Sequence, residues 1–248
     1  MVAKEFQASS PPNITSKNSH VGSIPTWLFF NVSSILSLNN NNFTGPFPQL
    51  DGNRIGLLAS LDIFKNFFYG PFPTNLHRNF ANLVTFLAYN AYFEGLIPPS
   101  YGEMDQLQHF DLSDNFLHGE IPYSLARNAT RLEYLDLSND SLQGQIPLEI
   151  GDLRYLQSLN MSPNLLTGHI PASLANMFVL ENLDLSHNKL ARKIPPEMMQ
   201  SISLSTFTVA FNILSGKVPW KGLPFEALDE SSYEGNTRHW RTIINKLQ

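Results

Sequence analysis

The chain has 248 residues, of which 42% are hydrophobic and 15% are charged, and its formal net charge is −5. This acidic balance argues against a nucleic-acid partner, because phosphate groups are bound by basic surfaces. The chain contains no cysteine, which by itself mildly favours a reducing compartment.

Residues 1–21 are polar and show no periodicity, so we expect a polar N-terminal arm. This segment lacks the apolar core of a signal peptide, and none is predicted. Elsewhere in the chain no uninterrupted apolar run reaches the roughly eighteen residues that a transmembrane helix needs, so no membrane span is predicted.

From Gly22 onward the sequence repeats, and one glycine slot recurs every 23 to 25 residues. The clearest copy, LQHFDLSDNFLHGEIP at residues 107–122, has the skeleton L-x-x-L-x-L-x-x-N-x-L-x-G-x-I-P, a leucine-rich repeat. We predict a solenoid over residues 22–219 with about eight to nine repeats. The glycine slots are Gly22, Gly45, Gly70, Gly95, Gly119, Gly144, Gly168, Arg192 and Gly216.

The x-L-x-L-x core of each repeat has the period of a β-strand with one buried face. In one repeat, Leu135 and Leu137 are predicted to point inward, whereas Tyr134 and Asp136 point outward. One such strand cannot bury its leucines alone, so successive repeats must stack and pair their strands in parallel. The predicted fold is therefore α/β. It is a right-handed leucine-rich-repeat solenoid (horseshoe) with a parallel β-sheet on the concave face. Short helical, 3-10 and turn segments lie on the convex face.

An asparagine closes the turn after most of the strands, because a buried amide can both donate to and accept from the loop backbone. Asp140 replaces it in one repeat, and we expect that rung to be weaker because a carboxylate has no donors. In another repeat Ala91 takes the slot and Asn90 precedes it, so an inserted residue or a bulge is expected there. The asparagine slots are Asn41, Asn66, Asn115, Asn164, Asn188 and Asn212.

The outward strand positions form columns across the concave face, and most of their residues are short and polar. Aromatic and basic side chains interrupt these columns over three or four rungs and are good contact anchors. Ordinary variation among repeats is the competing interpretation. The candidate ligand-binding residues are Phe64, Lys65, Tyr89, His109 and Tyr134.

Asp111 and Asp136 are expected on adjacent rungs, roughly 5 Å apart. Paired carboxylates can perform acid–base chemistry or hold calcium. The sequence has no nucleophile motif, phosphate-binding loop or metal-spaced histidine set to accompany them. We therefore predict that the protein is not an enzyme and has no catalytic residue, metal site or cofactor.

Beyond Pro219 the period is lost, and residues 220–248 are predicted to form a capping segment and tail. Its DESSYEG stretch is expected to cover the last coil, and residues 238–248 to form a short helix. The chain also has six Asn-x-Ser/Thr acceptor sites for glycosylation, which favour an extracellular setting. The glycosylation candidates are Asn13, Asn31, Asn42, Asn128, Asn139 and Asn160.

The repeat form L-x-L-S-x-N-x-L-x-G-x-I-P is the plant-specific type of leucine-rich repeat. Together with the segments FEGLIPPSYGEMDQLQHFDLSDN, LENLDLSHNKL and LDESSYEGN, it resembles the extracellular region of plant leucine-rich-repeat receptor-like proteins and receptor kinases. The resemblance covers about residues 22–236. The family's signal peptide, cysteine caps, membrane helix and kinase are not seen in this sequence, so it looks like a truncated member.

The resemblance implies a glycoprotein at the plasma membrane or outside the cell that binds a peptide, protein or glycan. It implies signalling through partner receptor kinases in defence or development, with the last repeats, around residues 182–219, meeting a receptor-kinase co-receptor. One alternative is a secreted inhibitor of a cell-wall-degrading enzyme, similar to plant polygalacturonase inhibitors. Another is a non-functional receptor remnant.

Overall fold

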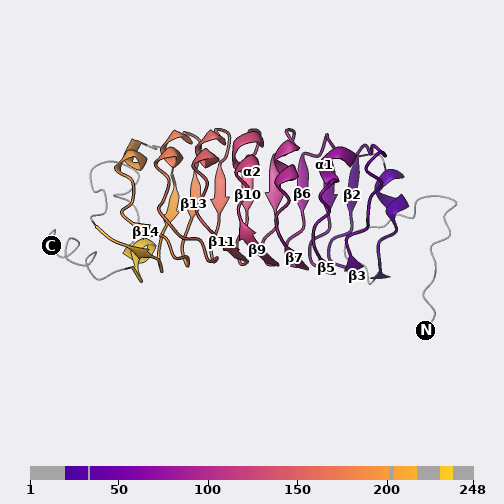
Figure 1. The fold of residues 1–248 in the computed structure, drawn as a ribbon, viewed down its shortest axis with the longest axis horizontal. Helices are drawn as coiled ribbons and strands as arrows, with labels where there is room; N and C mark the ends of the chain where they lie inside the picture. Colours follow the sequence, from indigo (N-terminus) through magenta and orange to yellow (C-terminus); the bar gives the residue numbers. More distant parts are fainter. Residues whose placement is uncertain (1–19, 33, 201–203, 217–229, 237–248) are drawn as a thin grey trace.

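The computed structural model describes residues 20–32, 34–200, 204–216 and 230–236 of the chain. Its coils stack side by side along one axis, from the indigo N-terminal end to the yellow C-terminal end (Figure 1). The strands fall into two parallel sheets and one further pair of strands, and short helical segments line the upper edge in this view. The protein is therefore the leucine-rich-repeat solenoid predicted from its sequence.

The main sheet has eight parallel strands in the order β15-β13-β12-β10-β8-β6-β4-β2. Neighbouring strands pair in the predicted columns, so that His109 lies beside Tyr134 and Tyr134 beside Ser158. The strands are β2 (Ile35–Ser37), β4 (Ser60–Asp62), β6 (Thr85–Leu87), β8 (His109–Asp111), β10 (Tyr134–Asp136), β12 (Ser158–Asn160), β13 (Asn182–Asp184) and β15 (Thr206–Thr208).

The inner side of the main sheet is packed with the leucine positions of the repeat. Leu112, Leu137, Met161 and Leu185, predicted to stack in one inward column, are completely buried. They come from successive coils, so each coil covers the apolar face of its neighbour. The predicted register of the repeats is confirmed.

A second parallel sheet, which the sequence pattern did not predict, forms from the residues that follow the asparagine slot. Extended backbone at this point needs hydrogen-bond partners, and the next coil supplies them. The sheet has six strands, and β14 (Ala191–Arg192) pairs separately with β16 (Ile213–Leu214). The six strands are β1 (Val21–Gly22), β3 (Asn42–Pro46), β5 (Phe67–Gly70), β7 (Tyr92–Gly95), β9 (Phe116–Glu120) and β11 (Ser141–Gln143).

Short helical segments return the chain from the second sheet to the main sheet. Several follow a proline in extended conformation, such as Pro122 with φ −62° and ψ 125°, which ends the preceding strand. Within the described part of the chain, none of these helices has the length and hydrophobicity needed to cross a membrane. They are η1 (Thr26–Phe30), α1 (Leu76–Asn79), η2 (Pro99–Glu103), α2 (Tyr123–Asn128), η3 (Leu148–Asp152), η4 (Ala172–Asn176) and η5 (Pro196–Gln200). A further 3-10 segment, η7 (Glu230–Tyr233), lies instead beside β15 at the end of the main sheet.

The asparagine slots form the predicted ladder of buried amides. The Nδ2 group of Asn115 donates to the carbonyl oxygens of Ala88 at 2.9 Å and Leu112 at 2.8 Å. Its Oδ1 atom accepts from the N–H of Phe93 at 3.0 Å. One side chain therefore bonds to the backbone of its own coil and of the preceding coil.

The ladder extends beyond the last predicted slot, because Asn236 occupies the same position in a further, atypical coil. Its Nδ2 group donates to the carbonyl oxygen of Val209 at 2.9 Å, and its Oδ1 accepts from Leu214 N–H at 3.0 Å. The N–H of Val209 also donates to Ser232 O at 2.8 Å. The described part of the DESSYEG stretch thus pairs with the last repeat, while the helix expected at residues 238–248 lies outside the described residues.

The prediction of an inserted residue or a bulge beside Ala91 is wrong. Asn90 has φ 50°, the same left-handed backbone that Lys65 and Asp114 adopt one coil away on either side. The pairing of β4, β6 and β8 also continues without a break. Asn90 therefore holds its regular position, and Ala91 simply replaces the slot asparagine.

At the N-terminal end, Val21 was assigned to the polar arm but pairs with β3 as part of β1.

The glycine slots need a left-handed backbone, and this explains why Arg192 is unfavourable. Arg192 has φ 70°, whereas Gly168 and Gly216 of the adjacent coils have φ 80° and 96°. We expect Arg192→Gly to raise the free energy of unfolding by about 1 kcal/mol, because glycine adopts this conformation without steric cost. Urea unfolding measures the change. Lys193→Gly, at an exposed neighbour outside the left-handed region, is the control and should not stabilise; equal effects of the two variants would refute the explanation.

Candidate functional site

The outer surface of the main sheet, here called the concave face, carries a cluster of two rings and one cation. The rings of Phe64 and Tyr89 stack with centroids 4.3 Å apart and planes within 10°. The Lys65 Nζ atom lies 6.0 Å from the centroid of the Tyr89 ring, at the range of a cation–π contact. Phe64, Lys65 and Tyr89 are named the aromatic cluster, and three of the five predicted residues therefore come together.

The backbone beneath the aromatic cluster is held by hydrogen bonds between coils. The N–H of Lys65 donates to the carbonyl oxygen of Tyr89 at 3.0 Å, and the N–H of Asn40 donates to Phe64 O at 3.0 Å. Lys65 has a left-handed backbone with φ 53°, which is costly for a lysine but fixed by this pairing. The cluster is therefore preorganised at its backbone, while the long Lys65 side chain stays exposed.

The other two predicted residues lie together on a different column. His109 is exposed on β8 beside Tyr134 of β10, and the Tyr134 hydroxyl donates to Asp136 Oδ2 at 3.1 Å. Asp111 and Asp136 occupy the column between this pair and the aromatic cluster, and they pair across β8 and β10. The five predicted residues therefore form two groups, and Asp111 and Asp136 lie between them. The adjacent positions of these two carboxylates were predicted from the sequence.

The two carboxylates are only 8% exposed, and this burial sets the electrostatics of the concave face. Burial raises the pKa of Asp111 to about 6, although the hydroxyl and N–H groups of Ser113 oppose the shift. Burial, followed by the charge of Asp136, raises the pKa of Tyr134 well above its ordinary value. The Tyr134 hydroxyl therefore keeps its proton and donates it to the hydrogen bond with Asp136. Within the described ranges, no group of three or more His, Cys, Asp or Glu residues is placed to hold a metal ion.

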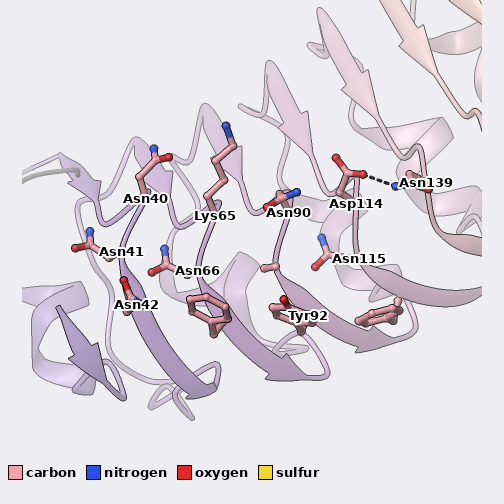
Figure 2. Close-up of a pocket in the computed structure, with 13 residues that line it drawn as sticks. Asn40, Asn41, Asn42, Lys65, Asn66, Asn90, Tyr92, Asp114, Asn115 and Asn139 are labelled. Atoms are coloured by element: carbon pink, nitrogen blue, oxygen red, sulfur yellow. Dashed lines mark hydrogen bonds between the residues drawn. The ribbon is translucent and has the colours of Figure 1, made fainter. Parts of the chain in front are cut away.

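A second exposed surface was not predicted from the sequence. The side chains of Phe67, Tyr92 and Phe116 are exposed and lie in a row at the start of the second sheet, where they line a groove. Figure 2 labels Tyr92 in this groove. The available signal was an aromatic residue directly after the asparagine slot in three successive repeats. The repeat pattern predicted a turn at this position and not a strand, so the signal did not indicate an exposed row.

The glycosylation candidates differ in accessibility. Asn160 lies half-buried on the concave face, where its Nδ2 group donates to Asp136 Oδ2 at 3.1 Å and its Oδ1 accepts from Ser162 N–H at 3.1 Å. Its amide is therefore already engaged. Asn13 lies outside the described residues, whereas the remaining acceptors are exposed: Asn31, Asn42, Asn128 and Asn139.

The fold and the concave face define a leucine-rich-repeat module of the kind used for binding, and comparison with known proteins agrees. The Leucine Rich Repeat family model matches residues 106–128, 131–153, 155–177 and 179–201. Receptor like protein 21 of Arabidopsis thaliana is 37% identical over 95 residues, which cover 37% of this chain and 9% of that protein.

Two solved receptor structures are similar over most of the chain. The ectodomain of the Arabidopsis thaliana membrane receptor kinase GASSHO1/SCHENGEN3, in complex with CASPARIAN STRIP INTEGRITY FACTOR 2, matches with a TM-score of 0.82 and 34% identity over 90% of this chain. The Arabidopsis receptor kinase HAESA, in complex with the peptide hormone IDA and the co-receptor SERK1, matches with a TM-score of 0.73 and 29% identity over 89% of it. The chain spans only 26% and 40% of those chains. It carries leucine-rich repeats similar to those of plant receptor-like proteins and receptor kinase ectodomains.

Proposed function

We propose that this chain is the ligand-recognising part of a plant receptor-like protein that faces the extracellular space and binds a peptide on its concave face. The similarity to ectodomains solved with CASPARIAN STRIP INTEGRITY FACTOR 2 and with the peptide hormone IDA supports the kind of ligand. The exposed acceptor sites for glycosylation are consistent with this location. Signal transmission through partner receptor kinases, in defence or development, completes the proposal.

The observation that carries the proposal is the aromatic cluster. Most of the other rungs offer short polar side chains at the equivalent positions, such as Ser113 and Ser138. The stacked rings of Phe64 and Tyr89 supply contact area at low entropic cost, and Lys65 supplies a mobile charge. A peptide crossing the strands would meet this cluster first and then the carboxylates beyond it.

The same proposal assigns co-receptor contact to the C-terminal repeats. The HAESA structure contains the co-receptor SERK1, which supports a receptor-kinase partner for this chain. The exposed residues on the last two main-sheet strands include Asn182 and Thr206, and the Thr206 hydroxyl donates to Asn182 Oδ1 at 2.7 Å. Short side chains of this kind form a level surface on which a second protein can pack.

The test begins with a phage-displayed library of random peptides selected on the wild-type domain. Selected peptides are then titrated calorimetrically against Tyr89→Ala and Phe64→Ala. We expect each variant to bind at least about ten-fold more weakly, because a buried aromatic anchor contributes more than about 1.4 kcal/mol. Arg154→Ala, exposed on the convex side, is the control and should bind like the wild type.

Two outcomes contradict the proposal. If Tyr89→Ala and Phe64→Ala bind like the wild type while Arg154→Ala loses affinity, the concave face is not the peptide site. If no peptide is selected and the domain instead binds and inhibits a polygalacturonase, the chain is an enzyme inhibitor and not a receptor module.

A further inference from the structure

A groove on the lateral side of the solenoid has two chemically different walls (Figure 2). One wall is the row of left-handed residues that follow the main-sheet strands, named the polar row: Asn40, Lys65, Asn90, Asp114 and Asn139. The other is the start of the second sheet, named the aromatic row: Phe67, Tyr92 and Phe116. The groove runs along the solenoid axis and crosses one coil after another.

The aromatic row is exposed although its neighbours in sequence are core residues. Phe67, Tyr92 and Phe116 are 46%, 47% and 60% exposed, whereas Phe68 and Phe93 beside them are almost fully buried. The exposed rings therefore add little to the core, and leaving such area in water is unfavourable. Three exposed rings in line form an apolar patch of the kind that a ligand can cover.

The spacing of the rings leaves part of each face open. Centroids are 5.8 Å apart between Phe67 and Tyr92, and 5.9 Å apart between Tyr92 and Phe116. The planes are within 13° and 34° of parallel. Such separations belong to offset rings rather than to rings in eclipsed contact. On the next coil the position is Ser141, so the outer face of Phe116 has no ring against it.

The polar row supplies donors and acceptors with little net charge. Asn40, Asn90 and Asn139 each carry an amide, which can both donate and accept. Lys65 and Asp114 carry opposite charges that balance each other, and the Asp114 carboxylate accepts a hydrogen bond from Asn139 Nδ2. A left-handed backbone directs these side chains away from the core, as the close-up shows for all five (Figure 2).

We propose that the lateral groove binds an uncharged, extended glycan with about one sugar for each coil. Sugar hydroxyls both donate and accept, as amides do, and the C–H faces of pyranose rings pack on aromatic rings. The coils stack roughly 5 Å apart and the ring centroids lie 5.8 and 5.9 Å apart, so each coil offers one ring to one sugar of an extended chain. A balanced charge in the groove gives no preference for a polyanion.

The experiment uses the unglycosylated domain, because the acceptor sites Asn42 and Asn139 line the groove. Cellohexaose, xylohexaose and mannohexaose are the neutral probes, and hexagalacturonate is the anionic probe. We expect calorimetric binding of at least one neutral probe, and binding at least about ten-fold weaker for Tyr92→Ala and for Phe116→Ala. Unchanged thermal unfolding of both variants, expected from their exposure, shows that the fold is intact.

Two controls separate this site from the others. Tyr123→Ala removes an aromatic side chain that is 65% exposed outside the groove and should leave glycan binding unchanged. Phe64→Ala removes a ring of the concave aromatic cluster and should also leave it unchanged. The proposal is overturned if no neutral probe binds, if hexagalacturonate binds as tightly as the neutral probes, or if Tyr92→Ala has no effect. Loss of peptide binding in Tyr92→Ala would also overturn it, because the groove would then be a peptide site.

Discussion

Asn188→Ala is expected to lower the free energy of unfolding by about 3 kcal/mol, because the substitution leaves several buried backbone groups without partners. Asn188 Oδ1 accepts from the N–H of Leu166 at 2.9 Å. Its Nδ2 group donates to the carbonyl oxygens of Met161 and Ser186, both at 2.9 Å. Alanine can replace none of these bonds, and water has little access to a side chain that is 8% exposed.

Urea unfolding of the isolated domain measures the loss, with Asn176→Ala as the control. Asn176 is also an asparagine but is exposed at the end of η4, so its replacement should change the free energy of unfolding by less than about 0.5 kcal/mol. Equal losses for the two variants would show that the amide ladder does not stabilise the solenoid as described.

Asp140→Asn is expected to stabilise the domain by about 2 kcal/mol at pH 8 and by less than about 1 kcal/mol at pH 4. Asp140 Oδ1 accepts from Leu117 N–H at 2.6 Å, but Oδ2 is buried without a hydrogen-bond partner in the described structure. On the next rung, the Nδ2 group of Asn164 donates to the carbonyl oxygen of Leu137 at 2.7 Å. An ionised Asp140 offers no such donor, whereas asparagine does.

The direction of the pH dependence follows from the raised pKa. Burial raises the pKa of Asp140 from its ordinary 3.8 to about 8, and the charges of Asp114 and Asp136 add to the effect, against a lowering by Leu117 N–H. The folded state therefore holds a proton that the unfolded state releases above about pH 4. This contribution to stability is complete below pH 4 and is lost as the pH rises to 8. The amide of the Asp140→Asn variant does not titrate, so the variant gains most at high pH.

Paired urea curves of wild type and Asp140→Asn at several pH values between 4 and 8 provide the measurement. Asp105→Asn is the control, because Asp105 is an exposed carboxylate outside the ladder. A difference between wild type and Asp140→Asn that stays constant with pH, or that grows towards pH 4, would contradict the burial of an ionisable group in this slot.

The register of the repeats and the asparagine ladder could be predicted because the same residue types recur at the same positions in successive repeats. Period-two leucines and a slot asparagine recur at near-constant spacing, so one misread position changes little. The backbone conformation of Arg192 is an example. Its φ of 70° follows from the glycines at the same position in neighbouring repeats, although arginine itself favours another backbone conformation.

The second sheet and the lateral groove could not be read from the same pattern. Residues after the slot asparagine alternate between exposed and buried over only four or five positions, so a turn and a strand fit equally well. The burial of Asp111 and Asp136 could not be predicted either. The LDLS segment places each aspartate on the outer side of a strand, but it does not show how much of the side chain the next coil covers. For the aromatic cluster, the columns predicted which residues share a face, but not that Phe64 and Tyr89 stack.

Hydroxyl-radical footprinting of the domain with and without a peptide selected from the random library tests the concave-face site most directly. It reports the accessibility of individual tyrosines in the intact wild-type protein. We expect the peptide to protect Tyr89 and Tyr134 while Tyr155, which is 65% exposed and lies outside the concave face, reacts at an unchanged rate. Protection of Tyr155 with unchanged reactivity of Tyr89 and Tyr134 would contradict recognition on the concave face.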